Sequence, residues 1–148
     1  MGPVKWYFDT SVLVAAAATQ HPHNIRALAV LEELISRKHD GYLSAHSLTE
    51  TYSVLTRIPF KPPLHPRDAW QILEAMIFPH MELLTLTPKE YRDVVHNCAV
   101  SGWTGGKVHD AVHLRCARKV GADRIYTFNV KDFKALAPPD LADKVSAP

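Results

Sequence analysis

The stretch that decides the fold is VKWYFDTSVLVAAAAT, which runs from Val4 to Thr19. Its first five residues are mostly β-branched or aromatic, which predicts a short buried strand. Asp9 follows this strand directly, and Thr10 and Ser11 can cap a helix through the alanine-rich Val12–Thr19. A strand, a tight turn and a helix in succession form the basic unit of α/β proteins. The carboxylate of Asp9 is therefore predicted at the C-terminal end of a core strand.

The rest of the chain repeats this alternation of strand and helix. Further strands are predicted at Tyr42–Ala45, Met81–Leu86 and Arg124–Phe128, with a short edge strand near Lys144. Helices are predicted at Asn24–Lys38, at Leu48–Arg57 with Ser47 as the cap, in a segment ending near Ile77, and at Pro88–Val100, Val108–Val120 and Lys131–Leu136. Because parallel neighbours need right-handed crossovers, this order predicts an α/β protein. Its mostly parallel sheet has four or five strands and helices on both faces.

Length and composition bound the class of protein. The chain has 148 residues, 47% of them hydrophobic and 22% charged, so a single domain spanning 1–148 is expected. The net charge of +2 cannot by itself drive tight binding to nucleic acid. The longest apolar run, Val12–Ala18, is too short to cross a bilayer, which predicts a cytoplasmic protein without membrane association. Cys98 and Cys116 have neither metal nor redox spacing and are expected to be buried thiols.

Acidic residues recur beside the predicted strand ends. Asp9 follows the first predicted strand. Glu50 lies early in the helix that follows the second strand, and Asp110 lies at the start of the helix that precedes the last main strand, Arg124–Phe128. Asn129 and Asp132 follow that last strand. Because parallel strands end at one edge of the sheet, these side chains are expected to lie together. Two carboxylates about 5 Å apart repel by roughly 3 kcal/mol at an effective dielectric near 20, so the cluster needs protons or a cation. An all-oxygen site of this kind suits Mg²⁺ or Mn²⁺ and points to phosphodiester hydrolysis.

Three blocks of sequence carry a family resemblance. They are FDTSVLVA at Phe8–Ala15, SLTETYSVLTR at Ser47–Arg57 and HDAVHLRCARKVGADRIYTFNVKDF at His109–Phe133. With the order of strands and helices between them, these blocks resemble PIN-domain proteins, and among those the VapC toxins of prokaryotic type II toxin–antitoxin modules. The last block is the most specific, since an acid, a helix, Gly-Ala-Asp, a strand and T-x-N-x-x-D-F recur together in this family. The resemblance implies a three-layer α/β/α fold and a Mg²⁺- or Mn²⁺-dependent endoribonuclease.

The resemblance also implies roles for individual residues. Asp9, Glu50 and Asp110 match the family's first three acids and are expected to be catalytic. Asp9 and Asp110 would be metal ligands, and Glu50 a water-mediated ligand or base. The fourth acidic position is Asn129 here, with Asp132 one turn further on, and both are candidates for a fourth ligand or for contacts around the metal. The hydroxyls that match the family's polar neighbours of these acids belong to Thr10, Ser11 and Thr127. Apart from the resemblance, basic residues cluster in the C-terminal third of the chain, and among them Arg115 and Lys131 are the candidates for RNA binding.

By the same resemblance, a metal-activated water would attack an RNA phosphodiester in line and leave 5′-phosphate and 3′-hydroxyl ends. The resemblance further implies a cognate antitoxin protein that blocks the site, and a homodimer. An apolar surface on Val12–Ala18 and Ala29–Ile35 is expected to serve the homodimer or the antitoxin.

Other functions are compatible with parts of the sequence. His109, Asp110 and His113 form H-D-x-x-H on a predicted helix, which resembles the histidine pair of zinc hydrolases with Asp in place of Glu. FDTSV resembles the aspartyl-phosphate phosphatases, but Ser11 stands where their second Asp is needed. A PIN-fold RNA-processing nuclease outside a toxin–antitoxin module is a further alternative. Asn129 keeps a non-catalytic interaction module open as well.

Overall fold

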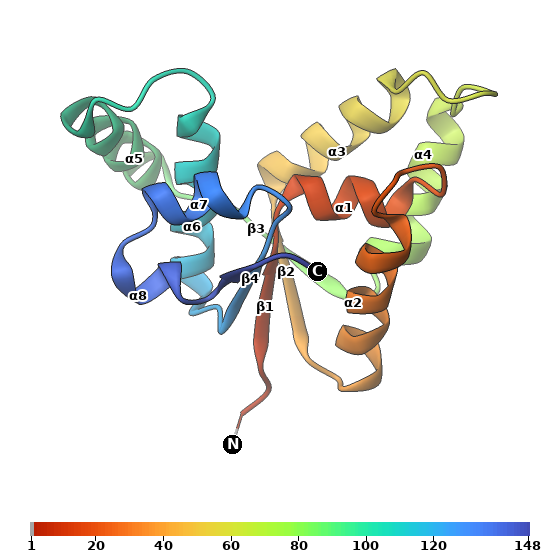
Figure 1. Cartoon of the computed structure of the whole chain (residues 1–148), viewed down its shortest axis with the longest axis horizontal. Helices are drawn as coiled ribbons and strands as arrows, with labels where there is room; N and C mark the ends of the chain where they lie inside the picture. The colour runs from red at the N-terminus through yellow and green to blue at the C-terminus, as the bar shows by residue number, and fades with distance from the viewer. Residues whose placement is uncertain (1) are drawn as a thin grey trace.

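Five parallel strands form the central layer of the protein (Figure 1). The computed structural model describes residues 2–148, and its strand order across the sheet is β3-β2-β1-β4-β5. The strands are β1 (Lys5–Phe8), β2 (Asp40–Ser44), β3 (Met81–Leu84), β4 (Arg124–Tyr126) and β5 (Val145–Ser146). Each neighbouring pair runs parallel. The predicted parallel sheet is therefore confirmed, including the short edge strand near Lys144.

Helices cover both faces of this sheet (Figure 1). One face carries α1 (Thr10–Ala17), α2 (Asn24–Ser36), α3 (Ala45–Arg57) and α4 (Pro66–Ile72), which continues into a π-helical segment at Leu73–Ile77. The other face carries α5 (Pro88–Ser101), α6 (Lys107–Val120), α7 (Val130–Leu136) and α8 (Pro139–Ala142). The predicted three-layer α/β/α architecture is confirmed.

Strand β1 lies in the middle of the sheet, and both of its faces are buried. Trp6 and Phe8 pack into the core formed with α1 and α2, whereas Tyr7 packs into the core on the α6 side. Successive side chains of a strand point to opposite faces, so a strand covered on both sides needs an unbroken apolar run. The same alternation brings the hydroxyl of Tyr7 to the face that carries α6.

Two helix starts differ from the sequence prediction. Ser44, and not Ser47, caps α3, because the Ser44 Oγ accepts the backbone N–H of Ser47 at 2.9 Å. Helix α3 consequently begins at Ala45, earlier than Leu48, and the side chain of Ser47 is fully buried. At α1 the cap position is Asp9, whose carboxylate makes no capping hydrogen bond. The side chains of Ser47 and Asp9 therefore do not cap a helix and can contact other residues.

The apolar run on α1 is part of the core and not a surface patch. Every residue from Val12 to Ala18 is at most 6% exposed, because the small side chains let α1 pack against both α2 and α3. On α2, Leu31 and Leu34 are buried, while Ile25 is 83% and Ile35 is 43% exposed. The prediction of an exposed apolar surface is therefore wrong for α1. On α2, exposed apolar side chains are present on the outer side of the helix.

Two further expectations concern the thiols and the membrane. Cys98 and Cys116 are both buried and free, as predicted. Within residues 2–148, none of the helices combines the length and the apolar character that crossing a membrane requires.

Gly41 in β2 lies where the neighbouring backbone and side chains leave no room for a side chain. A Cβ at this position would lie 2.9 Å from the carbonyl oxygen of His80, and equally close to the side chains of Leu34 and Met81. We expect Gly41→Ala to lower the free energy of unfolding by about 1–3 kcal/mol, because the sheet must shift to accept a methyl group. Urea unfolding measures this loss.

The matched control is Gly106→Ala. Gly106 has helical backbone angles, and a Cβ there would meet no atom within 4 Å. This substitution should be neutral or stabilising by up to about 1 kcal/mol. Equal losses at Gly41 and Gly106 would contradict the steric account.

An ion pair between α5 and α6 makes the stability depend on pH. The Glu90 Oε1 accepts hydrogen bonds from Lys119 Nζ at 2.7 Å and from the backbone N–H of Thr87 at 2.9 Å. The hydrogen bond from Lys119, followed by that from Thr87, lowers the pKa of Glu90 to about 2. A carboxyl group with a lowered pKa stabilises the fold above its ordinary pKa, and this contribution is lost as the pH falls through the folded-state value.

We therefore expect Glu90→Gln to destabilise the protein at pH 7, with a loss that shrinks as the pH falls from 4.5 to about 2. A double-mutant cycle with Lys119→Met, followed by urea unfolding, measures the coupling between the two side chains. A coupling that stays constant over this pH range would refute the assignment.

Candidate functional site

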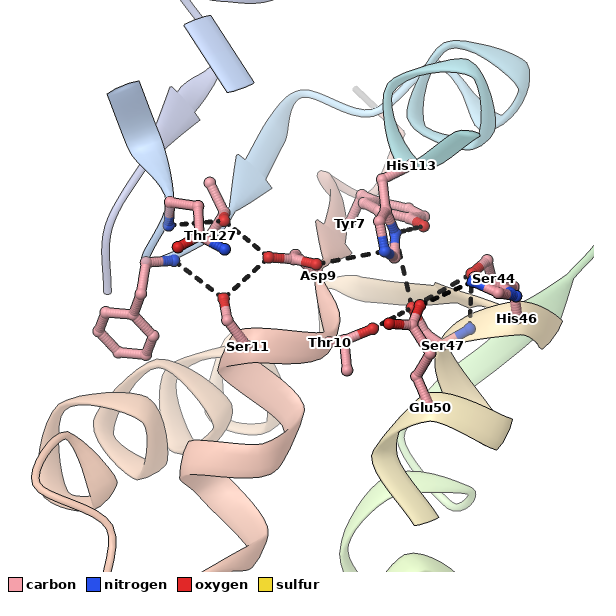
Figure 2. Close-up of polar contacts among 12 residues, drawn as sticks. Tyr7, Asp9, Thr10, Ser11, Ser44, His46, Ser47, Glu50, His113 and Thr127 are labelled. Atoms are coloured by element: carbon pink, nitrogen blue, oxygen red, sulfur yellow. Dashed lines mark hydrogen bonds and ion pairs between the residues drawn. The ribbon is translucent and has the colours of Figure 1, made fainter. Parts of the chain in front are cut away.

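The carboxyl ends of β1, β2 and β4 meet at one edge of the sheet, and Figure 2 shows Asp9 and Glu50 there. Asp9 comes directly after β1, and Glu50 comes from α3, which follows β2. Asp110 lies in the first turn of α6, and Thr127 follows β4. Parallel strands place all of these positions at the same edge, as the sequence indicated.

Asp9 is the most tightly held of these residues. It is only 4% exposed, and its Oδ2 accepts hydrogen bonds from Ser11 Oγ at 2.8 Å and from Thr127 Oγ1 at 2.7 Å. Its Oδ1 lies 3.2 Å from His113 Nε2 (Figure 2). A carboxylate offers about four acceptor positions, so these three contacts leave one position, on Oδ1.

The donors to Asp9 are themselves fixed by the backbone. Ser11 Oγ accepts the N–H of Phe128 at 3.0 Å, and Thr127 Oγ1 accepts the N–H of Asn129 at 2.9 Å. The hydroxyls of Ser11 and Thr127 thus link α1 to the segment between β4 and α7. This arrangement agrees with the expectation that Ser11 and Thr127 lie beside an acid, here Asp9.

A second group of hydroxyls lies on the other side of Asp9 (Figure 2). Thr10 Oγ1 donates to Ser47 Oγ at 3.1 Å, and Ser44 Oγ donates to the same atom at 3.2 Å. All three residues are buried. Thr10 therefore contacts α3 and makes no hydrogen bond to an acid.

Glu50 lies at the rim of the site beside two stacked imidazoles. Its Oε1 is 2.8 Å from His46 Nε2, and the rings of His46 and His109 stack with centroids 5.1 Å apart and planes 9° apart. The alignment between Glu50 and His46 does not meet hydrogen-bond geometry, so within residues 2–148 the buried Glu50 Oε1 has no aligned donor. This oxygen can accept a proton or bind a water.

The pKa of Asp110 is raised by its surroundings. Burial, followed by the charges of Asp9, Asp132 and Glu50, raises the pKa of Asp110 to about 6, although the imidazole of His109 opposes the shift. Burial is the largest cause of this shift, and the charges of Asp9, Asp132 and Glu50 add to it. Asp9, Glu50 and Asp110 lie at the same edge of the sheet, and Asp132 also acts on Asp110.

The remaining predicted residues lie further out. Asn129 and Asp132 are both exposed at the start of α7, and the Asn129 side chain does not cap that helix. Arg115 is half-buried on α6, with its Nε 3.8 Å from Glu90 Oε2. Lys131 is exposed on α7. A role in RNA binding for Arg115 and Lys131 remains a prediction.

His113 contacts Asp9 from inside the core, a position that the sequence did not predict. It is only 2% exposed, with Nδ1 2.7 Å from the Tyr7 hydroxyl and Nε2 facing Asp9. Burial lowers the pKa of His113, although the charges of Asp9 and Glu50 oppose this shift. Because both ring nitrogens are engaged inside the protein, and His109 stacks on His46, the two histidines of H-D-x-x-H do not form a zinc pair.

The donor set of the site fits a hard divalent cation. Among residues 2–148, no three His, Cys, Asp or Glu side chains are close enough to enclose a metal ion by themselves. Mg²⁺ and Mn²⁺ do not need such an enclosure, because one or two carboxylates with waters and substrate phosphate complete their coordination. The open position on Asp9, the charge on Asp110 and the undonated Glu50 oxygen match this requirement.

The comparison with known proteins agrees with this fold. The sequence profile of the PIN domain matches residues 6–137, and the chain belongs to the PIN domain family. Its curated relatives include ribonuclease VapC40 of Mycobacterium tuberculosis, which is 34% identical over 77% of this chain and 79% of that protein. Ribonuclease VapC27 of the same organism is 31% identical over 70% of each chain.

Solved structures of VapC-type proteins share the fold. The crystal structure of VapC20 from M. tuberculosis, described as a toxin that cleaves the sarcin–ricin loop, superposes with a TM-score of 0.68 at 19% identity and covers 90% of this chain and 96% of its own. VapBC2 of Rickettsia felis, bound to a promoter DNA fragment, has a TM-score of 0.68 at 18% identity, with 97% and 98% covered. At these identities the likeness concerns the fold.

The raised pKa of Asp110 predicts that this residue destabilises the metal-free protein. A carboxyl group whose pKa is raised from 3.8 to about 6 on folding costs no stability below pH 4 and its full penalty above pH 6. In the presence of a chelator, Asp110→Asn should therefore raise the melting temperature at pH 7.5 and leave it nearly unchanged at pH 4. Calorimetry at the two pH values measures the difference. A lower melting temperature at pH 7.5 would mean that Asp110 is not in a negative environment.

Proposed function

We propose that this chain is a Mg²⁺- or Mn²⁺-dependent endoribonuclease, acting as the VapC-like toxin of a toxin–antitoxin module. The observation that carries the proposal is the group of carboxylates at the carboxyl edge of the sheet. Their charges contribute, after burial, to the raised pKa of Asp110. The names of the curated relatives, which are ribonucleases, support the choice of RNA as the substrate.

In this proposal Asp9 and Asp110 bind the cation, and Glu50 holds a water. A bound Mg²⁺ or Mn²⁺ would make that water more acidic and offset the charge on the leaving oxygen. The chain's own residues orient the parts. Ser11, Thr127 and His113 hold the Asp9 carboxylate in one direction. The Glu50 carboxylate, whose Oε1 lies 2.8 Å from His46 Nε2, would take a proton from the water. No histidine needs to act on the ribose 2′-hydroxyl.

The strand of RNA would lie across the acidic edge and be held by basic side chains around it. Lys131 on α7 and Arg115 on α6 are the candidates for phosphate contacts, because both helices border the site. Asn129 and Asp132 at the start of α7 would contribute through water or as a fourth ligand. Products with 5′-phosphate and 3′-hydroxyl ends are expected.

A cognate antitoxin and a second copy of the chain are the proposed protein partners. Among the proteins of similar fold is FitAcB of Neisseria gonorrhoeae, with a TM-score of 0.60 over 96% of this chain, and VapBC2 of Rickettsia felis is another. An antitoxin would block the acidic edge. For the homodimer, the outer side of α2 with exposed Ile25 and Ile35 is the candidate contact.

Cleavage of RNA by purified variants tests the proposal. We expect Asp9→Asn and Asp110→Asn each to lower the rate at least about 100-fold, because each removes charge from the cation site. The far-ultraviolet circular dichroism spectrum should stay unchanged. The wild-type reaction should need Mg²⁺ or Mn²⁺ and stop on addition of a chelator.

The matched control is Asp68→Asn, an exposed acid in the first turn of α4, which should cleave RNA like the wild type. Activity with Zn²⁺ alone, or cleavage of casein and not of RNA, would favour the zinc hydrolase instead. Undiminished RNA cleavage by the Asp9 or Asp110 variant would rule out the assigned site.

A further inference from the structure

A buried chain of hydrogen-bonding groups runs from β1 through α6 back to Asp9 (Figure 2). The Tyr7 hydroxyl lies 2.7 Å from His113 Nδ1, and His113 Nε2 lies 3.2 Å from Asp9 Oδ1. Tyr7 is fully buried, and His113 and Asp9 are 2% and 4% exposed. All three side chains of this chain are therefore largely shielded from solvent.

The chemistry of the groups fixes the direction of each contact. A carboxylate oxygen accepts, so the tautomer of His113 that places a proton between the ring and Asp9 Oδ1, 3.2 Å from Nε2, is the one protonated on Nε2. Nδ1 is then an acceptor, and the Tyr7 hydroxyl donates to it. The opposite tautomer would turn a lone pair of Nε2 toward the carboxylate. Ser47 Oγ, at 3.5 Å from Nδ1, is the next hydroxyl within reach.

The position of His113 in α6 links it to a second acid. Asp110 lies three residues earlier on the same helix, so the two side chains project from neighbouring turns. Helix α6 therefore positions both Asp110 and the His113 imidazole, which contacts Asp9. A shift of α6 would change the separation of the two carboxylates and the direction of Asp9 together.

A buried polar chain of this kind has a cost that an apolar side chain would avoid. Neighbouring positions on the inner side of α6 are Val112, Leu114 and Cys116, all buried in the same core. An apolar residue at position 113 would avoid burying the imidazole, but it would leave the Tyr7 hydroxyl without this partner and take the imidazole away from Oδ1 of Asp9. The histidine therefore serves the polar contacts to Tyr7 and Asp9 more than the apolar packing of the helix.

We propose that His113, held in its Nε2–H tautomer by Tyr7, is a positioning residue that aims the open acceptor position of Asp9 at the divalent cation. This inference rests on the proposed role of Asp9 as a metal ligand. His113 contacts neither the cation nor the RNA, and it acts only through Asp9.

Binding of Mn²⁺ to the metal-free protein, measured by titration calorimetry without RNA, tests the inference. We expect His113→Leu to weaken Mn²⁺ binding about 10- to 100-fold, which is typical when a hydrogen-bond partner of a metal ligand is removed. His113→Gln should restore part of the affinity, because its side-chain N–H can donate to Asp9. Tyr7→Phe should cause a smaller loss, because Ser47 can take over as donor to Nδ1.

The matched control is Leu114→Val, which alters the next buried position of α6. It should reduce stability slightly and leave the affinity for Mn²⁺ unchanged. If Leu114→Val weakens Mn²⁺ binding as much as His113→Leu, the effect belongs to helix packing and the inference is overturned. The inference is also overturned if His113→Leu binds Mn²⁺ like the wild type while Asp9→Asn does not.

A spectroscopic readout needs no variant and covers the case in which His113→Leu fails to fold. Nitrogen-15 spectra of the metal-free wild type should show a neutral His113 with its proton on Nε2. A proton on Nδ1 would overturn the inference. If instead Asp9→Asn binds Mn²⁺ as tightly as the wild type, the proposed metal role of Asp9 itself has failed.

Discussion

The burial of one carboxyl group, that of Asp9, is the constraint on which the candidate site depends. Asp9 stands at the end of the central strand with 4% of its surface exposed, and a charge in that position needs several donors to remain there. The donors come from α1, from α6 and from the segment after β4, so three separate parts of the chain converge on two oxygen atoms. The geometry of the whole edge follows from satisfying that group.

The same edge is electrostatically unfavourable as it stands. Around Asp9, which is well paired, the fold assembles further carboxylates, and their repulsion contributes to the raised pKa of Asp110. A sequence optimised for stability alone would avoid this arrangement. Retaining it makes sense if a cation normally occupies the site, because the ion offsets the repulsion and turns a destabilising cluster into a binding one.

Much of this organisation was visible in the sequence, and the exceptions have physical reasons. The acids could be grouped because each follows or precedes a strand, and parallel strands end at a common edge. The prediction of Ser47 as the cap of α3 is wrong because Ser44, the last residue of β2, turns its hydroxyl to the backbone N–H of Ser47, and only the local backbone decides this. The role of His113 could not be predicted, because its partner Tyr7 is 106 residues away and on another element. A lone histidine among apolar residues was the only signal.

The contact between Thr127 and Asp9 spans 118 residues, and it has a consequence for synthesis of the protein. The N-terminal strand emerges from the ribosome first, yet it lies in the middle of the sheet and must wait for β4 to arrive beside it. Until Thr127 has been translated, Asp9 lacks one of its donors and the acids lack their common edge. Assembly of the acidic edge is therefore one of the later events in the synthesis of this domain.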